Sequence, residues 1–217
     1  GVMPGIKVDK GLIDLVEFPG EKVTEGLDDL AERMYEYEGL GARFAKWRSA
    51  FEISEKGPSD AVIALNAVTL ARYASICQEH GIVPMVEPEV LMHGDHSIAR
   101  AEEVTTRVLQ ILFTTLREYK VDLSGVILKT SMVLAGDAHA VQTSPDEVAD
   151  ATLRTLRLTI PYEVAGIVYL SGGQTPVRAT ENLQAIQSRG PQPWKMTFSY
   201  SRALEEPVLA AWQGKEE

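Results

Sequence analysis

Short runs of apolar and β-branched residues alternate along the chain with longer segments whose apolar residues recur at helical spacing. The strand-like runs fall at residues 5–8, 43–48, 82–87, 125–129, 166–171 and 195–200. Each is followed by a helical pattern, at residues 27–38, 60–80, 98–119, 145–160, 180–189 and 202–212. Strict alternation of this kind predicts βαβ units and a parallel sheet.

The six pairs are predicted to belong to a single domain covering residues 1–217. No Ser/Gly-rich linker, low-complexity tract or strong charge run separates them. Local signals mark the helix starts, and they are clearest at Ser144. Its hydroxyl can cap free backbone N–H groups, and Glu147 completes a capping box. Pro145 occupies the first helical position. This order of elements suits either a doubly wound open sheet or a closed (β/α)₈ barrel.

Polar and charged residues at the strand ends decide between these two architectures. They are Lys7, then Lys46 and Arg48, Glu87 and Glu89, Lys129, the turn Ser171-Gly172-Gly173, and Ser201-Arg202. A single strand-end lysine usually reaches out to water, but all six strand ends carry such groups. A barrel brings these ends to one mouth, so the fold predicted is α/β, a TIM (β/α)₈ barrel.

Within this set, residue spacing predicts which side chains meet. Side chains alternate across a strand, so Lys46 and Arg48 share one face while Trp47 points to the other. Glu87 and Glu89 also share a face. Lys129 follows an apolar run in a strand expected to be covered on both sides, where an unpaired ammonium group is costly.

Composition narrows the class of partner and the compartment. With 21 Lys and Arg against 31 Asp and Glu, the formal charge is −10, which disfavours binding of nucleic acid or anionic membrane by bulk charge. Cys77 is the single cysteine, so an internal disulfide is impossible and a reducing, cytoplasmic location is expected. Apolar runs such as 108–113 are far shorter than the roughly 20 residues of a membrane span.

Several stretches together resemble a known family, the class I, Schiff-base-forming fructose-bisphosphate aldolases. They are Gly5-Ile6-Lys7-Val8-Asp9-Lys10-Gly11, Phe44-Ala45-Lys46-Trp47-Arg48, residues 82–89, Leu128-Lys129, Leu170-Ser171-Gly172-Gly173-Gln174 and residues 197–204. The resemblance implies a partial barrel domain, residues 1–217, with strands 3 to 8 of eight. It also implies that the first two βα units and the C-terminal tail lie outside this sequence. The start at Gly1, without methionine, leads us to expect a segment upstream.

The resemblance further implies a reaction and a catalytic set. The reaction is reversible cleavage of fructose 1,6-bisphosphate to dihydroxyacetone phosphate and glyceraldehyde 3-phosphate, in glycolysis and gluconeogenesis. Lys129 would form the imine, Glu87 would transfer protons at the carbinolamine, and Glu89 would orient the cations. Lys46 would contact substrate hydroxyls and the developing charge. The protonated imine is itself the electron sink, so neither a metal nor another cofactor is expected.

The resemblance also implies that the substrate is a phosphorylated sugar and where its phosphates bind. Ser171, Gly172 and Gly173, with Arg202, match the grip on the C1 phosphate, because glycine permits close backbone approach and arginine offers a bidentate fork. Ser201 stands where the family usually has glycine. Lys7 and Arg48 match groups near the C6 phosphate.

Other readings of the chain remain open at this stage. The segment His93-Gly94-Asp95-His96 is the one local candidate for a metal-dependent enzyme. No Gly-x-Gly-x-x-Gly follows a strand, which disfavours a nucleotide-dependent oxidoreductase. A non-catalytic fragment or homologue acting only through protein contacts is the main alternative. Preference among fructose 1,6-bisphosphate, fructose 1-phosphate and sedoheptulose 1,7-bisphosphate, and assembly as a homo-oligomer, are not decided by the sequence.

Overall fold

A parallel sheet of six strands forms the centre of the molecule in the computed structural model, which describes residues 1–215. The strands are β1 (Gly5–Lys7), β4 (Phe44–Phe51), β5 (Val83–Val90), β6 (Ile127–Thr130), β7 (Gly166–Tyr169) and β8 (Met196–Phe198), and they lie in the sheet in this order. All neighbouring pairs are parallel. Chain order therefore equals sheet order, as the barrel prediction requires.

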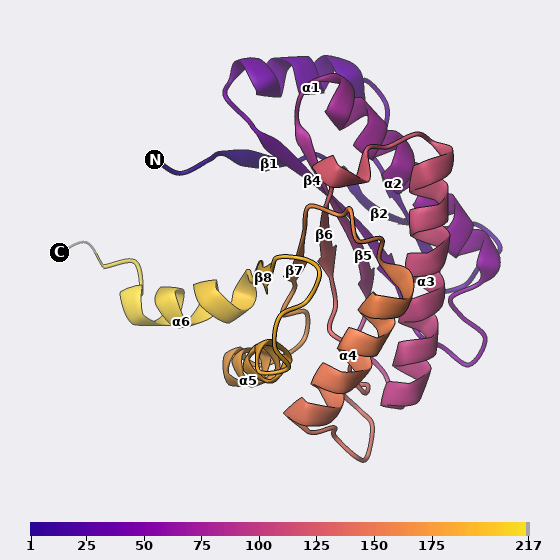
Figure 1. Ribbon diagram of the computed structural model, residues 1–217, viewed down its shortest axis with the longest axis vertical. Coiled ribbons are helices and arrows are strands. Elements are labelled where there is room, and N and C mark those ends of the chain that lie inside the picture. Colours follow the sequence, from indigo (N-terminus) through magenta and orange to yellow (C-terminus); the bar gives the residue numbers. More distant parts are fainter. Residues whose placement is uncertain (216–217) are drawn as a thin grey trace.

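Helices connect the strands and follow one another around the outer side of the sheet (Figure 1). They are α1 (Leu30–Gly39), α2 (Asp60–Glu79), α3 (Ile98–Glu118), α4 (Pro145–Thr159), α5 (Pro176–Gln187) and α6 (Arg202–Trp212). The N-terminus and α6 lie on the same side of the molecule, away from α2 and α3. The described residues thus form the larger part of a barrel wall with its helical outer layer.

The core lies between the sheet and the outer helices. Trp47 of β4 is fully buried and stacks on Tyr73 of α2, with ring centroids 5.4 Å apart. Lys46 and Arg48 project from the opposite face, so the alternation predicted for this strand is confirmed. Alternation thus places apolar side chains under the helices and charged ones inside the curve of the sheet.

Helix starts follow the local chemistry of the sequence. Ser59, Ser97, Ser144 and Thr175 each accept a hydrogen bond from a backbone N–H in the first turn of the helix they precede. The capping box between Ser144 and Glu147 is present as predicted. The start predicted for α5, residue 180, is wrong. The helix begins at Pro176, behind the same cap-then-proline signal that marks α4.

Two further elements were not anticipated from the sequence. An antiparallel hairpin, β2 (Gly11–Asp14) and β3 (Lys22–Glu25), is inserted between β1 and α1. Thr24 of the hairpin donates a hydrogen bond of 2.7 Å to the carbonyl of Arg48, which ties β3 to β4. A single 3₁₀ turn, η1 (Leu123–Gly125), precedes β6. A further hydrogen bond, from Asn66 Nδ2 to the carbonyl of Lys22, ties the hairpin to α2, so it packs against both β4 and α2.

β4 and β5 each run three residues beyond the predicted ends, to Phe51 and Val90. Pro88 is tolerated inside β5 because its backbone nitrogen points away from β4. Val83 and Leu91 donate to β4, so odd-numbered residues of β5 face that strand and Pro88 faces the other side. β5 pairs with β6 only at Met85 and Val86. The missing N–H of Pro88 therefore breaks no strand pairing.

The helix α2 has the length and apolar composition that would suffice to cross a membrane, although the sequence reading found no such segment. Just over half of the apolar window is buried, 56%. Ala67, Leu70, Ala71 and Ala74 belong to the core beside the sheet. This burial identifies α2 as a core helix of the barrel wall.

The two flanks of the sheet are less covered than its centre. Within residues 1–215, β1 pairs only with β4, and β8 pairs only with β7. The final helix α6 exposes a row of apolar side chains, namely Leu204, Val208, Leu209 and Trp212. Its main helical neighbour is α5. The apolar face of α6 is thus unpartnered in this part of the chain.

Candidate active site

A cavity of about 310 Å³ opens at the carboxyl ends of the strands, inside the curve of the sheet. Most of the predicted site residues line it: Lys46, Arg48, Glu87, Glu89, Lys129, Ser171, Gly172, Ser201 and Arg202. Lys7 and Gly173 do not. Ser199, which was not singled out as a site residue, also contributes to the wall. Five successive strands or their following loops thus supply one charged pocket.

Glu87 stands between two lysines at the centre of this cavity. Its Oε1 lies 3.1 Å from Lys129 Nζ, and its Oε2 lies 2.9 Å from Lys46 Nζ. Both contacts are ion pairs, and Glu87 Oε2 has no hydrogen-bond partner among the described residues. The Glu87 side chain is only 4% exposed and that of Lys129 10%. One buried carboxylate therefore serves two ammonium groups from strands on either side of it.

A second ion pair lies nearer the mouth. Arg48 Nε donates to Glu89 Oε2 at 2.5 Å. The other oxygen of Glu89 faces the turn after β7, since a Cβ built on Gly172 would lie 2.5 Å from Glu89 Oε1. Any larger residue at position 172 would have to displace this carboxylate. Glu89 therefore connects β4, β5 and the turn that follows β7.

The strand register explains these partners. Arg48 is paired in the sheet with Glu87, yet its side chain reaches Glu89; Lys46 likewise reaches two residues beyond its register partner Met85. Both cations of β4 therefore reach toward the carboxyl end of β5. This common offset gives each cation a different carboxylate, a pairing that sequence spacing alone does not specify.

Lys7 lies on β1 beside Lys46 in the register, but its ammonium group is held outside the cavity. Lys7 Nζ contacts Asp9 Oδ1 at 2.5 Å, and its side chain is half exposed. Asp9 is buried and also accepts from the backbone N–H of Arg48 at 3.2 Å. Asp9 was missed as a site residue. Its position two residues after Lys7, at the strand exit, is the signal that could have identified it.

The turn after β7 and the start of α6 form the remaining wall. Gln174 N donates to Ser171 O at 2.8 Å and closes the turn, while Gly173 has a φ of 79° and lines the neighbouring cavities beside α5. Arg202, counted among the strand-end groups, is the first residue of α6, so the helix predicted at residues 202–212 is confirmed. The strand before it, β8, ends at Phe198, two residues before the predicted end.

The segment His93-Gly94-Asp95-His96, the alternative metal site, is hydrogen-bonded to the loop that contains Asp137 and His139. Asp137 accepts from Gly94 N at 2.9 Å and contacts His93 Nδ1 at 3.2 Å, and His139 Nδ1 contacts Asp95 O at 2.7 Å. Burial lowers the pKa of His96. Within residues 1–215, no three His, Cys, Asp or Glu side chains are grouped so that they could hold a metal ion.

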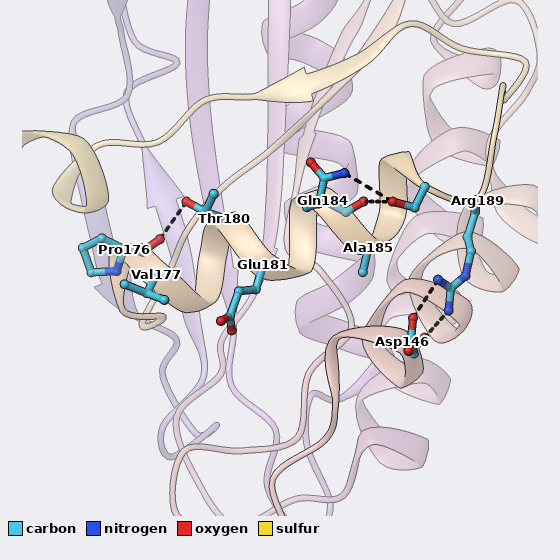
Figure 2. A pocket seen from close by; sticks show the side chains of 9 residues that line it. Asp146, Pro176, Val177, Thr180, Glu181, Gln184, Ala185 and Arg189 are labelled. Atoms are coloured by element: carbon cyan, nitrogen blue, oxygen red, sulfur yellow. Dashed lines mark hydrogen bonds and ion pairs between the residues drawn. The ribbon is translucent and has the colours of Figure 1, made fainter.

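A roomier cavity, of about 700 Å³, lies away from the strand ends, between α4 and α5 (Figure 2). Its charged wall is an ion pair between Arg189 and Asp146 at 2.8 Å. The Thr180 hydroxyl in the wall donates to the backbone carbonyl of Pro176. These groups satisfy one another, so the larger cavity offers less reactive chemistry than the smaller charged pocket.

Comparison with known proteins places the whole chain among aldolases. The family model "Glycolytic: Fructose-bisphosphate aldolase class-I" matches residues 1–217. The chain is 51% identical over 212 residues to a probable fructose-bisphosphate aldolase class 1 of Xylella fastidiosa, covering 98% of this chain and 64% of that protein. It is 51% identical over 217 residues to the fructose-bisphosphate aldolase of Schistosoma mansoni, covering 100% of this chain and 60% of that protein.

A solved structure agrees with these relatives. The fructose-bisphosphate aldolase of Plasmodium falciparum, in a ternary complex with TRAP and a small-molecule inhibitor, aligns with a TM-score of 0.98 at 49% identity. The alignment covers 99% of this chain and 62% of that one. The chain therefore spans less than two thirds of the length of these relatives. Since the family match covers residues 1–217 and the solved aldolase structure superposes on nearly the whole chain, the chain belongs to the class I fructose-bisphosphate aldolase family.

Proposed function

We propose that the protein cleaves fructose 1,6-bisphosphate reversibly to dihydroxyacetone phosphate and glyceraldehyde 3-phosphate, through a Schiff base on Lys129. The observation that carries this proposal is the buried trio at the sheet centre, where Glu87 lies 3.1 Å from Lys129 Nζ and 2.9 Å from Lys46 Nζ. Two ammonium groups share one carboxylate. Release of a proton from Lys129 leaves a neutral Lys46–Glu87 pair, so the free amine needed for attack is accommodated without an unbalanced charge.

In the proposed reaction, the neutral Lys129 amine adds to the C2 ketone of the substrate and forms a carbinolamine. Glu87, a carboxylate paired with Lys46 in the resting site, takes up a proton as the amine adds and passes it to the departing hydroxyl, which leaves as water and yields the iminium ion. A base then takes the C4 hydroxyl proton, the C3–C4 bond breaks, and its electron pair moves to the iminium nitrogen. The aldehyde product, glyceraldehyde 3-phosphate, departs and leaves an enamine on Lys129. A proton added at C3 regenerates the iminium ion, and its hydrolysis returns Lys129 and releases dihydroxyacetone phosphate.

The remaining polar groups suit a substrate with a phosphate at each end. Ser171, the backbone of Gly172 and the guanidinium of Arg202 surround one end of the cavity and would hold the C1 phosphate. Arg48 and Lys7 would meet the C6 phosphate. Both are already paired with carboxylates, Glu89 and Asp9. This second grip would therefore require the cations to share or exchange partners when substrate binds.

We infer that residues 1–217 form the greater part of one barrel domain that two further βα units complete. The open edges of β1 and β8 and the exposed apolar row on α6 support this inference. The greater length of the relatives supports it as well. A cytosolic location is supported by a 49% identical relative, fructose-bisphosphate aldolase 4, cytosolic, of Arabidopsis thaliana.

Trapping of the imine tests the proposed function. Borohydride added to the full-length protein with dihydroxyacetone phosphate should reduce the imine and fix the ligand to Lys129, identified by mass spectrometry of the peptides. Lys129→Met should yield no adduct, whereas the matched Lys195→Met, at an exposed lysine, should be labelled like the unaltered protein. An adduct that persists in Lys129→Met, or the absence of one in the unaltered protein, would overturn the mechanism.

A further inference from the structure

An asparagine in the core of α5 has no role in the chemistry above. Asn182 is fully buried and lies on the same helix face as Ala179 and Ile186, which are also fully buried. Its Oδ1 has no hydrogen-bond partner among the described residues. A buried amide oxygen without a hydrogen-bond partner destabilises the folded chain. An apolar residue of similar size would avoid this cost.

The other end of the Asn182 amide makes a short, directed contact. Asn182 Nδ2 donates to Gln174 Oε1 at 2.7 Å. Gln174 Nε2 in turn faces Met132 Sδ at 3.8 Å, in the segment that follows β6. The Gln174 side chain thus bridges the interior of α5 and the strand that carries Lys129.

Gln174 is also the last residue of the turn proposed to hold the C1 phosphate. Its backbone N–H donates to Ser171 O at 2.8 Å, so the position of Gln174 sets the path of Ser171 and Gly172. A small void of about 10 Å³, bordered by Gly172, Met132 and Gln174, lies behind the turn. Packing from behind is therefore incomplete, and the Asn182–Gln174 hydrogen bond adds a side-chain link between the turn and the interior face of α5, the helix that follows the turn directly in the chain.

We propose that Asn182 is a positioning residue that acts through Gln174 to hold the Ser171–Gly172 turn in the conformation that receives the phosphate of a phosphorylated ketose. The proposal rests on the function proposed above and adds a residue remote from the substrate. The Nδ2 group of Asn182 fixes the turn through Gln174. The unpaired Oδ1 on the buried face of α5 lowers the stability of the fold, which is the cost of this role.

The test compares Asn182→Leu with a control in the full-length protein. Asn182→Leu should raise the Kd for inorganic phosphate, and the KM for fructose 1,6-bisphosphate, about tenfold, the factor that follows from losing one buried hydrogen bond. Its kcat should stay within about threefold. Ile186→Ala, on the same face of α5, should destabilise the fold as much or more while leaving phosphate affinity unchanged.

A double-mutant cycle separates positioning from general loss of stability. Gln174→Met lies at the turn, retains the length of the side chain and removes the acceptor of the Asn182 bond. If Asn182 acts through Gln174, the Kd for phosphate in the double variant should equal that of Gln174→Met alone. Independent, multiplying effects would overturn the proposal, and so would an unchanged Kd in Asn182→Leu.

The inference and the proposed function fail in different ways. If the unaltered protein forms no borohydride adduct, the Schiff-base function is wrong, while the phosphate Kd still reports on the turn. If the adduct forms and Asn182→Leu binds phosphate normally, only the role of Asn182 is wrong. If the unaltered protein forms the adduct but binds no inorganic phosphate, the positioning proposal is overturned by itself.

Discussion

The centre of the pocket and its β7–β8 flank are built differently. At the centre, Lys46, Glu87 and Lys129 come from three neighbouring strands, β4, β5 and β6. The side chains of Glu87 and Lys129 are almost fully buried. At the flank, Ser201 and Arg202 are exposed at the start of α6, whose apolar row lacks a partner within residues 1–215.

This difference separates two requirements of the proposed reaction. The groups proposed to form the imine are held by sheet register and by the helices that cover the central strands. The groups proposed to bind phosphate depend on a turn and on a helix with few contacts. We therefore expect substitutions at the centre to reduce the rate of chemistry, and substitutions at the flank to weaken binding.

Glu87→Gln is the most severe test of the centre. Loss of the group proposed to transfer protons should slow imine formation about 10²- to 10⁴-fold, measured as the rate of borohydride-trapped adduct at saturating dihydroxyacetone phosphate. Glu103→Gln, at an exposed glutamate paired with Arg100, is the matched control and should leave the rate unchanged. A Glu87→Gln rate within threefold of the unaltered protein would contradict the role of Glu87.

Arg202→Ala tests the flank, where we expect substrate binding to weaken and the rate of chemistry to change little. Removing a charged hydrogen-bond donor worth about 1.5–3 kcal/mol should raise the KM roughly 10- to 100-fold, while kcat falls much less. The melting temperature should hardly move because Arg202 is exposed. Arg72→Ala, at an exposed arginine of α2, serves as the control. If kcat falls as far as kcat/KM does, the separation between chemistry and binding is wrong.

Gly172→Ala tests the contact between the two regions. A methyl group here would meet Glu89 Oε1 and disturb its pair with Arg48, so we expect a loss of about 1–3 kcal/mol in the free energy of unfolding, measured in urea. Gly39→Ala, at a helical glycine with open space around its Cα, should leave stability equal or slightly higher. Equal stability of the two variants would show that Glu89 moves freely.

The smallest effect is expected for the pH dependence of stability that comes from His96, in the loops beside the pocket. Burial lowers the pKa of His96, although Asp95 and Asp137 act in the raising direction and His139 in the lowering one. The unfolded chain therefore takes up the His96 proton first, and stability falls as pH drops below about 6.5. His96→Asn should remove this part of the acid loss, under about 1 kcal/mol, measured as urea midpoints at pH 7 and pH 5.5. A parallel fall in both proteins would contradict it.

Several features of the fold were predictable because they depend on neighbours in the chain. The alternation of strands and helices, the burial of Trp47 opposite Lys46, and the capping box at Ser144 all follow from periodicity and local hydrogen bonding. The start of α5 at Pro176 was also encoded locally, by Thr175 and the proline after it. The hairpin β2–β3 was missed because its strands are four residues each and lie in what reads as a simple connection.

The partners within the pocket were not predictable in the same way. That Lys46 meets Glu87 and Arg48 meets Glu89 depends on the register and twist of β4 against β5. The same holds for Asp9, which holds Lys7 away from the cavity. It also holds for Gly172, whose missing side chain leaves room for Glu89.

The sequence by itself determined which residue types stand at the strand ends, and with them the barrel order and the resemblance to aldolases. These depend on spacing along the chain, which is local. Only the tertiary structure decided that one buried carboxylate serves Lys46 and Lys129, and that Asn182 reaches the turn at Ser171 through Gln174. Contacts between residues far apart in the chain are set by how strands and helices pack, and an ion pair or a hydrogen bond forms only where that packing brings its atoms within about 3 Å.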